Sequence, residues 1–248
     1  MLENNAIIGN YIRVIDVTGE FSDLACENGG VIVTLDGSSG IINYLEVFKT
    51  AEDEAISFAN HLSKMNSLYK YLCPSADEPE RNEFEEYVRK LYEIKGLWQN
   101  NTLEHQQITG LPPEVYPTFD DLLALIRSDL YEDFEERKVN RNLSPSKWRR
   151  LENIELTLSN LVNSYGKMFN GKTSIPDLSD KQIIVYNVQN VSTLKSEIFN
   201  ALLFNVMSRM FDDMIRIGVP SKQMYESGKP IYQIPKLLLM VDEAHKFI

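Results

Sequence analysis

Apolar positions divide the chain into strand-like ends and a helical middle. The runs at residues 11–17 (YIRVIDV) and 30–36 (GVIVTLD) are rich in β-branched residues with little polar alternation, which predicts strands covered on both faces. The segment FSDLACENGG that follows the first run predicts a short helix. Strand character returns at residues 181–188 (KQIIVYNV), and an unbroken apolar run at 237–241 predicts a last strand.

The middle of the chain has helical periodicity, with apolar side chains at steps of three and four. We expect helices over residues 51–72, 78–98, 119–134 and 144–165. Two of them carry start signals. Thr118 and Asp121 form a weaker version of the capping box, and Ser144 before Pro145 is typical of an N-cap with a first-turn proline.

The order of these elements predicts the fold class. A further helix over 193–215 follows the 181–188 strand and is apolar nearly all round, so we expect it to be central rather than superficial. Strands separated by a long helical stretch predict an α/β protein, with a mostly parallel sheet and an inserted all-helical subdomain. We place the first part of the core at 1–49, the helical subdomain at 50–165 and the second part of the core at 166–248.

Composition narrows the class of protein. With 248 residues, 43% of them apolar and 25% charged, the chain predicts a soluble globular protein. A formal net charge of -11 excludes a surface that is basic all over, although a local basic lining stays open. Cys26 and Cys73 support neither a disulfide framework nor a zinc site, which favours a reducing cytoplasm. We expect no membrane span and no signal peptide.

A literal match to the phosphate-loop pattern G-x-x-x-x-G-K-S/T occurs from Gly166 through Gly171 and Lys172 to Thr173. A functional loop of this kind follows a strand and opens a helix at the Lys. Here helical periodicity precedes the match, and Pro176 follows four residues after the Lys, where it would interrupt a helix. The context therefore predicts a turn that ends a helix, not a nucleotide site.

The acidic pair after the last apolar run suggests a metal-dependent reaction. A parallel strand that ends in Asp242 and Glu243 would deliver both carboxylates to the ligand-binding edge of a sheet. Asp242 would hold Mg²⁺, and Glu243 would polarise the water that attacks a terminal phosphate. Two alternatives stay open: a buried strand whose acidic end caps the next helix, and the DEAH signature of a helicase superfamily, which would include His245.

Several segments, in order, resemble the FtsK–HerA clan, particularly the motor ATPases of conjugation and type IV secretion. VIDVTGEFSDLACENGGVIVTL resembles the D-x-x-G-E-F/Y segment that follows the family's phosphate loop and first helix. PTFDDLLALI resembles the helix that ends its inserted helical region, and GKMFNGKTSI followed by QIIVYNVQNV resembles its F-x-G-x-T turn and next strand. LLLMVDEAHKFI resembles its Walker B strand.

The resemblance implies a RecA-like P-loop NTPase core, incomplete at both ends, that uses ATP and Mg²⁺. It assigns Asp242 to Mg²⁺ and Glu243 to water activation, and it places Glu20 near the nucleotide at the same sheet edge. For Glu20 a purely structural role in the first turn of a helix is an equal alternative. The full protein would form hexamers in the cytoplasm and would meet the inner face of the membrane only through partners, the other secretion or conjugation proteins.

The family's own phosphate loop should precede residue 11, where no G-K-S/T stands. We therefore expect this sequence to be the middle of a motor domain that is inactive alone. Two other functions stay open: a non-catalytic interaction module whose helical region binds a secretion partner, and a related DNA translocase or helicase.

Overall fold

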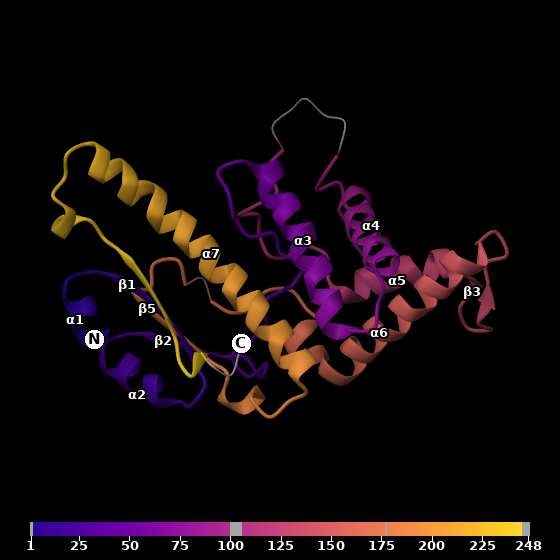
Figure 1. Ribbon diagram of the computed structural model, residues 1–248, viewed down its shortest axis with the longest axis horizontal. Helices are drawn as coiled ribbons and strands as arrows, with labels where there is room; N and C mark the ends of the chain where they lie inside the picture. Colours follow the sequence, from indigo (N-terminus) through magenta and orange to yellow (C-terminus); the bar gives the residue numbers. More distant parts are fainter. Residues whose placement is uncertain (1, 100–105, 177, 245–248) are drawn as a thin grey trace. The chain divides into compact units, whose positions relative to one another are not determined.

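The computed structural model describes residues 2–99, 106–176 and 178–244. The chain forms two compact units. One comprises Met1–Gly40, Phe48–Glu52 and Ser174–Ile248 and is called the sheet unit; the other comprises Ile41–Val47 and Asp53–Thr173 and is called the helical unit (Figure 1). The division into a core at 1–49 and 166–248 and an insertion at 50–165 stays a prediction. None of the helices in the described ranges is long and apolar enough to cross a membrane.

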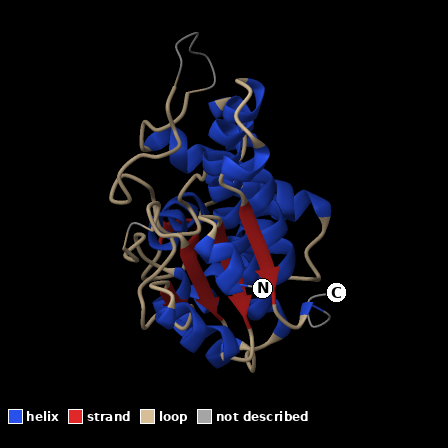
Figure 2. Ribbon diagram, turned by 90° about the vertical axis from the view of Figure 1, so that its left-hand side faces the viewer, coloured by secondary structure: helices blue, strands red, loops and turns tan. Residues whose placement is uncertain are grey.

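The sheet unit is a parallel α/β structure. Its elements are α1 (Leu2–Ile7), β1 (Tyr11–Asp16), α2 (Glu20–Glu27), β2 (Val31–Thr34), β5 (Ile183–Asn187), η1 (Gln189–Val191), α7 (Ser196–Glu226), η2 (Ile231–Gln233) and β6 (Leu237–Val241). Four strands pair in the order β2-β5-β1-β6, and every pairing is parallel. Their carboxyl ends therefore share one edge, which the arrowheads of the red strands show in Figure 2. The register aligns Asp16 with Asn187, and Ile15 with Val241.

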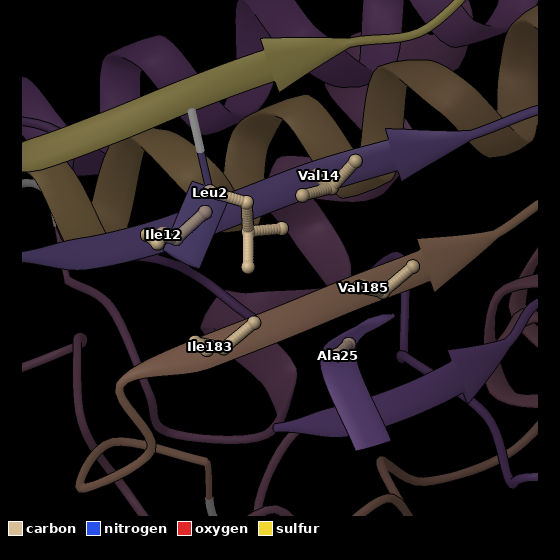
Figure 3. Packing of buried hydrophobic residues seen from close by; sticks show 6 residues of the cluster. All are labelled: Leu2, Ile12, Val14, Ala25, Ile183 and Val185. Atoms are coloured by element: carbon tan, nitrogen blue, oxygen red, sulfur yellow. The ribbon is translucent and has the colours of Figure 1, made fainter. Parts of the chain in front are cut away.

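One face of this sheet carries an apolar core. Its buried members are Leu2, Ile12, Val14, Ala25, Ile183 and Val185 (Figure 3). Alternate residues of a strand face opposite sides of a sheet, so Ile12 and Val14 share the face that meets α1 and α2. The helices contribute Leu2 and Ala25, whose side chains lie against β1 and β5 in Figure 3.

The opposite face packs on α7 through a buried ion pair. Arg13 of β1 donates from Nε to Asp213 Oδ2 at 2.6 Å, and the two side chains are 0% and 3% exposed. Arg13 Nη1 also donates to the carbonyl oxygens of Ile12 and Gln182. The charge pair and these hydrogen bonds offset part of the cost of removing the two groups from water, while Arg13 Nη2 is buried without a hydrogen-bond partner among the described residues.

Three expectations about burial are wrong. The helix expected at 193–215 extends to Glu226, with Pro220 inside it, and it is not buried all round, because Met207 and Phe211 are 45% and 49% exposed. Only one side of α7 packs on the sheet. The last apolar run forms an edge strand, so Leu239 and Val241 remain 42% and 44% exposed. β2 is the other edge strand and is only partly buried.

The helical unit agrees with the periodicity of the middle of the chain. Its elements are α3 (Glu54–Leu72), α4 (Glu78–Ile94), α5 (Phe119–Leu130), β3 (Tyr131–Asp133), β4 (Lys138–Val139) and α6 (Pro145–Phe169). The capping box of Thr118 and Asp121 is present at the start of α5. Ser144 Oγ accepts from the backbone N–H of Lys147, which confirms the N-cap of α6.

The C-terminal ends of three helices in this unit differ from the sequence expectation. The helix expected at 78–98 ends at Ile94. The helix expected to run to residue 134 stops at Leu130, because β3 and β4 pair as a short antiparallel hairpin. The helix expected to end at 165 has a kink at Tyr165 (φ -128°, ψ 16°) and continues to Phe169. A backbone break at the expected place therefore exists, but the chain resumes helical hydrogen bonding beyond it.

Candidate functional site

The turn after β1 and the end of β6 are joined by a carboxylate. Asp242 directly follows β6, and its Oδ2 accepts hydrogen bonds from Thr18 Oγ1 at 2.8 Å and from the Thr18 backbone N–H at 3.2 Å. The backbone N–H of Asp242 donates to the carbonyl oxygen of Ile15 at 2.9 Å, which extends the β1–β6 pairing by one bond. Asp242, at the end of β6, therefore contacts Thr18 in the turn that follows β1.

A second carboxylate, that of Asp16, accepts hydrogen bonds from the same turn and from the start of α2. Asp16 is fully buried, and its Oδ1 accepts from the backbone N–H of Gly19 at 2.8 Å. Its Oδ2 accepts from the backbone N–H of Phe21 at 3.2 Å and from Ser22 Oγ at 3.3 Å. Gly19 has φ 86°, a left-handed conformation that favours glycine. Asp16 therefore fixes the start of α2 by satisfying backbone donors that a helix leaves free.

Side-chain amides from the end of β5 join the same turn. Asn187 Nδ2 donates to Ser22 Oγ at 3.2 Å, and Gln189 Nε2 donates to the carbonyl oxygen of Thr18 at 3.0 Å. The Gln189 amide lies so close to Gly19 that a Cβ atom at this glycine would stand 2.9 Å from Gln189 Oε1. The ends of three strands are therefore connected by side-chain hydrogen bonds at one edge.

The remaining strand, β2, is followed by Asp36, which makes a separate hydrogen bond to the turn after β5. Asn190 Nδ2 donates to Asp36 Oδ2 at 2.7 Å. Hydrogen bonds from Ser38 and Asn190 lower the pKa of Asp36 below its ordinary value. An ionised carboxylate at this position strengthens both bonds.

The residues predicted from the sequence to form the site stand at this edge with different surroundings. Asp242 is half-buried and held by Thr18. Glu243 is the next residue, with a backbone in the left-handed region at φ 49°. Glu20 is the first residue of α2, directly after Gly19, and its side chain is exposed. His245, which belongs to the DEAH string, lies outside the described residues.

The donor atoms at this edge suit a hard cation that is shared with another ligand. Across residues 2–99, 106–176 and 178–244, no three or more Asp, Glu, His and Cys side chains gather in a way that could hold a metal ion. The second carboxylate oxygen of Asp242, Oδ1, accepts no hydrogen bond from this part of the chain. Mg²⁺ is usually held by one or two carboxylates together with waters and substrate phosphates, so such a site needs no complete protein cage.

The phosphate-loop match lies in the helical unit, and its polar groups are engaged there. Lys172 Nζ donates to the carbonyl oxygen of Tyr116. Thr173 Oγ1 donates to Glu46 Oε2 and accepts from the backbone N–H of Asn43 at 2.9 Å. The match begins in the last turn of α6 and continues past the end of that helix at Phe169, which confirms a helix-ending turn and gives neither flank that a phosphate loop requires.

Sequence reasoning missed the roles of Asp16, Thr18 and Gln189. The D-x-x-G-E segment contains the first two, but the motif drew attention to its glutamate. Asp followed by a turn and a helix is a capping signal that could have identified Asp16. Gln189 gives no such signal, because its partner Thr18 is distant in sequence.

Comparison with known protein families finds no family model that matches the chain. A Bacillus anthracis protein described as uncharacterized is 28% identical over 253 residues, which cover 96% of this chain and 38% of that protein. The chain therefore spans well under half the length of this relative.

Among solved structures, VirB4 of Thermoanaerobacter pseudethanolicus superposes with a TM-score of 0.73. The match covers 100% of this chain and 80% of that one, at 18% sequence identity. At this identity the similarity establishes the fold. The prediction of an α/β protein with a parallel sheet of the RecA type and several inserted helices is confirmed.

Proposed function

We propose that the carboxyl edge of the sheet unit is part of the Mg²⁺–ATP site of a motor that energises conjugative DNA transfer or type IV secretion. The observation that carries the proposal is the pair of hydrogen bonds between Thr18 and Asp242. They join the D-x-x-G-E turn to the acidic pair after β6, two segments that resemble the same motor family and are far apart in sequence. The VirB4-like fold supports the same family.

Each carboxylate has a distinct role in this proposal. Asp242 would hold Mg²⁺ through Oδ1, while Thr18 occupies Oδ2 and fixes the side-chain orientation. Glu243 would accept a proton from the water that attacks the terminal phosphate. Glu20 would stand near the nucleotide at the exposed start of α2, where the partial positive charge of the helix also favours an anion. Bound Mg²⁺ would supply charge neutralisation for the phosphates.

The proposal extends to the assembly of the whole protein. This chain covers 38% of the Bacillus anthracis relative, so the activity and the assembly are proposed for the whole protein. We infer a cytoplasmic, hexameric ATPase that works with other secretion or conjugation proteins. The alternatives are a module that only binds such a partner through its helical unit, and a DNA translocase of the same clan.

The test uses the full product of the reading frame that encodes this chain. We expect Mg²⁺-dependent ATP hydrolysis, and Glu243→Gln should lower kcat by about 100-fold or more, as loss of a general base does. ATP binding, measured by calorimetry, should remain. Glu226→Gln is the matched control, because it makes the same change at an exposed position of α7.

Three results would separate the alternatives. Hydrolysis that is equally fast in the Glu243→Gln variant would refute the assigned role. Partner binding that depends on the helical unit but not on nucleotide or Asp242 would favour the interaction module. Strong stimulation of hydrolysis by DNA would favour the translocase.

A further inference from the structure

We propose that Gln189 is a positioning residue for Asp242, acting through Thr18. This inference rests on the proposed function, because it gives Asp242 a metal to hold. Gln189 and Asp242 follow different strands, β5 and β6, which do not pair with each other but both pair with β1. The turn after β1 is therefore the element through which one can influence the other.

The peptide unit between Thr18 and Gly19 is clamped at both polar atoms. Its carbonyl oxygen accepts from Gln189 Nε2 at 3.0 Å, and its N–H donates to Asp16 Oδ1 at 2.8 Å. A peptide group is planar, so fixing both atoms fixes the orientation of the whole unit. Asp16 is fully buried and provides the immobile side of the clamp, and Gln189 provides the other side.

Gln189 is itself held in place by its own loop. Its backbone N–H donates to Asn187 Oδ1 at 3.0 Å, and its carbonyl oxygen accepts from Ser192 Oγ at 2.7 Å. It opens the short helix η1, which leads into α7. The Gln189 backbone is therefore held in place, and its side-chain amide can restrict the position of the Thr18 carbonyl oxygen.

Thr18 in turn orients Asp242 through two hydrogen bonds to Oδ2. The hydroxyl and the backbone N–H both reach Oδ2, at 2.8 and 3.2 Å. Two donors on one carboxylate oxygen restrict rotation of the carboxylate and leave Oδ1 as the oxygen directed to another ligand. Both donors branch from Thr18 Cα, which lies in the plane of the Thr18–Gly19 peptide, so a displacement of that plane would move them relative to Asp242.

Gln189 is exposed, so the bond it makes should contribute little to global stability. Its loss should instead change the metal dependence of the reaction. In the full product, we expect Gln189→Ala to raise the Mg²⁺ concentration for half-maximal ATP hydrolysis by about tenfold, as the loss of an outer-shell partner typically does. The KM for ATP at saturating Mg²⁺ and the Tm should stay unchanged. Gln189→Glu should behave like the alanine variant, because it keeps the acceptor oxygens and loses the N–H donor.

Asn190→Ala is the matched control, since Asn190 is an exposed amide in the same turn that binds Asp36 and does not reach Thr18. The double variant Thr18→Val, Gln189→Ala distinguishes a positioning role from a merely structural one. If Gln189 acts through Thr18, Gln189→Ala should cause a smaller further shift in Mg²⁺ dependence when Thr18 is already Val, because only the backbone N–H of residue 18 then still binds Asp242.

The outcomes distinguish this inference from the proposed function. If Asp242→Asn abolishes Mg²⁺-dependent hydrolysis but Gln189→Ala keeps the Mg²⁺ dependence of the wild type, the positioning role is overturned and the proposed function stands. Additive effects of the Thr18 and Gln189 substitutions overturn it as well. If Asp242→Asn leaves hydrolysis unchanged, both fall.

Discussion

The free energy of unfolding of the helical unit should depend on pH in the neutral to alkaline range because of one buried lysine, Lys64. This lysine lies on the buried side of α3, is 7% exposed, and donates from Nζ to the carbonyl oxygen of Tyr44 at 3.0 Å. Burial lowers the pKa of Lys64 to about 7, against an opposing effect from the nearby Glu46 carboxylate. An ordinary lysine has a pKa of 10.5.

The sign and size of the effect follow from proton binding. Between pH 7 and 10.5 the unfolded chain holds a proton on Lys64 that the folded chain has released, so raising the pH favours folding. Each pH unit in that window contributes about 1.4 kcal/mol to the free energy of unfolding. From pH 7.5 to 9.5 the helical unit should gain about 3 kcal/mol. The gain is lost again as the pH falls from 10.5 toward 7, and below 7 Lys64 gives no further slope because both states hold the proton.

Three buried groups of the helical unit, His61, Tyr44 and Tyr92, do not titrate in this window. Burial lowers the pKa of His61 well below its ordinary value, which keeps the imidazole neutral above pH 7. Burial raises the pKa of Tyr44 and Tyr92 well above the ordinary value of tyrosine. The slope should therefore depend on Lys64.

Tryptophan fluorescence can measure the effect, because both tryptophans, Trp98 and Trp148, belong to the helical unit. Urea unfolding at several pH values would give the free energy of unfolding for the wild type and for Lys64→Met. We expect a rising free energy in the wild type and a much flatter profile in the variant. Lys70→Met is the control, since Lys70 is an exposed lysine of the same helix. Parallel slopes for wild type and Lys64→Met would refute a depressed pKa at Lys64.

Two further predictions concern the sheet unit. Arg13→Leu should destabilise this unit by about 3–5 kcal/mol, because it leaves Asp213 buried without its main partner; amide hydrogen exchange of β1 would report the loss, and equal protection in variant and wild type would contradict it. Gly19→Ala should cost about 1–2 kcal/mol, because φ 86° is unfavourable for alanine, and should displace the Gln189 side chain. Thermal unfolding together with the Mg²⁺ dependence of hydrolysis would check the second prediction, and it fails if neither changes.

The strands and most helices could be predicted because local signals agreed with the final structure. The β-branched runs became β1, β2 and β5, and the capping signals at Thr118 and Ser144 started α5 and α6 where expected. Such signals depend on neighbours in sequence. They do not show which strand will lie at an edge, and for this reason the burial of β2 and β6 was overestimated.

Helix ends were harder to predict because distant contacts decide them. Residues 131–133 continue an acidic, helix-compatible segment, yet pairing with Lys138–Val139 draws them into a hairpin. The helix expected at 193–215 continues through Pro220 to Glu226 in α7. Tertiary context overrides propensity in both cases.

The candidate site shows the same division between local and distant information. Apolar residues before Asp242 and Glu243 predict that a strand ends there, and parallel pairing then places its end beside that of β1. The pattern cannot reveal that Thr18 holds Asp242 or that Gln189 binds the carbonyl oxygen of Thr18, because these contacts connect residues 224 and 171 positions apart. The motif therefore predicts which residues would meet a ligand, whereas the structure shows the residues that hold Asp242 and the Thr18–Gly19 peptide. Substitutions at Thr18 or Gln189 should shift the Mg²⁺ dependence of hydrolysis while they leave the Tm nearly unchanged. A turn with the same hydrogen bonds but only a structural role would show the opposite, a lower Tm and an unchanged Mg²⁺ dependence.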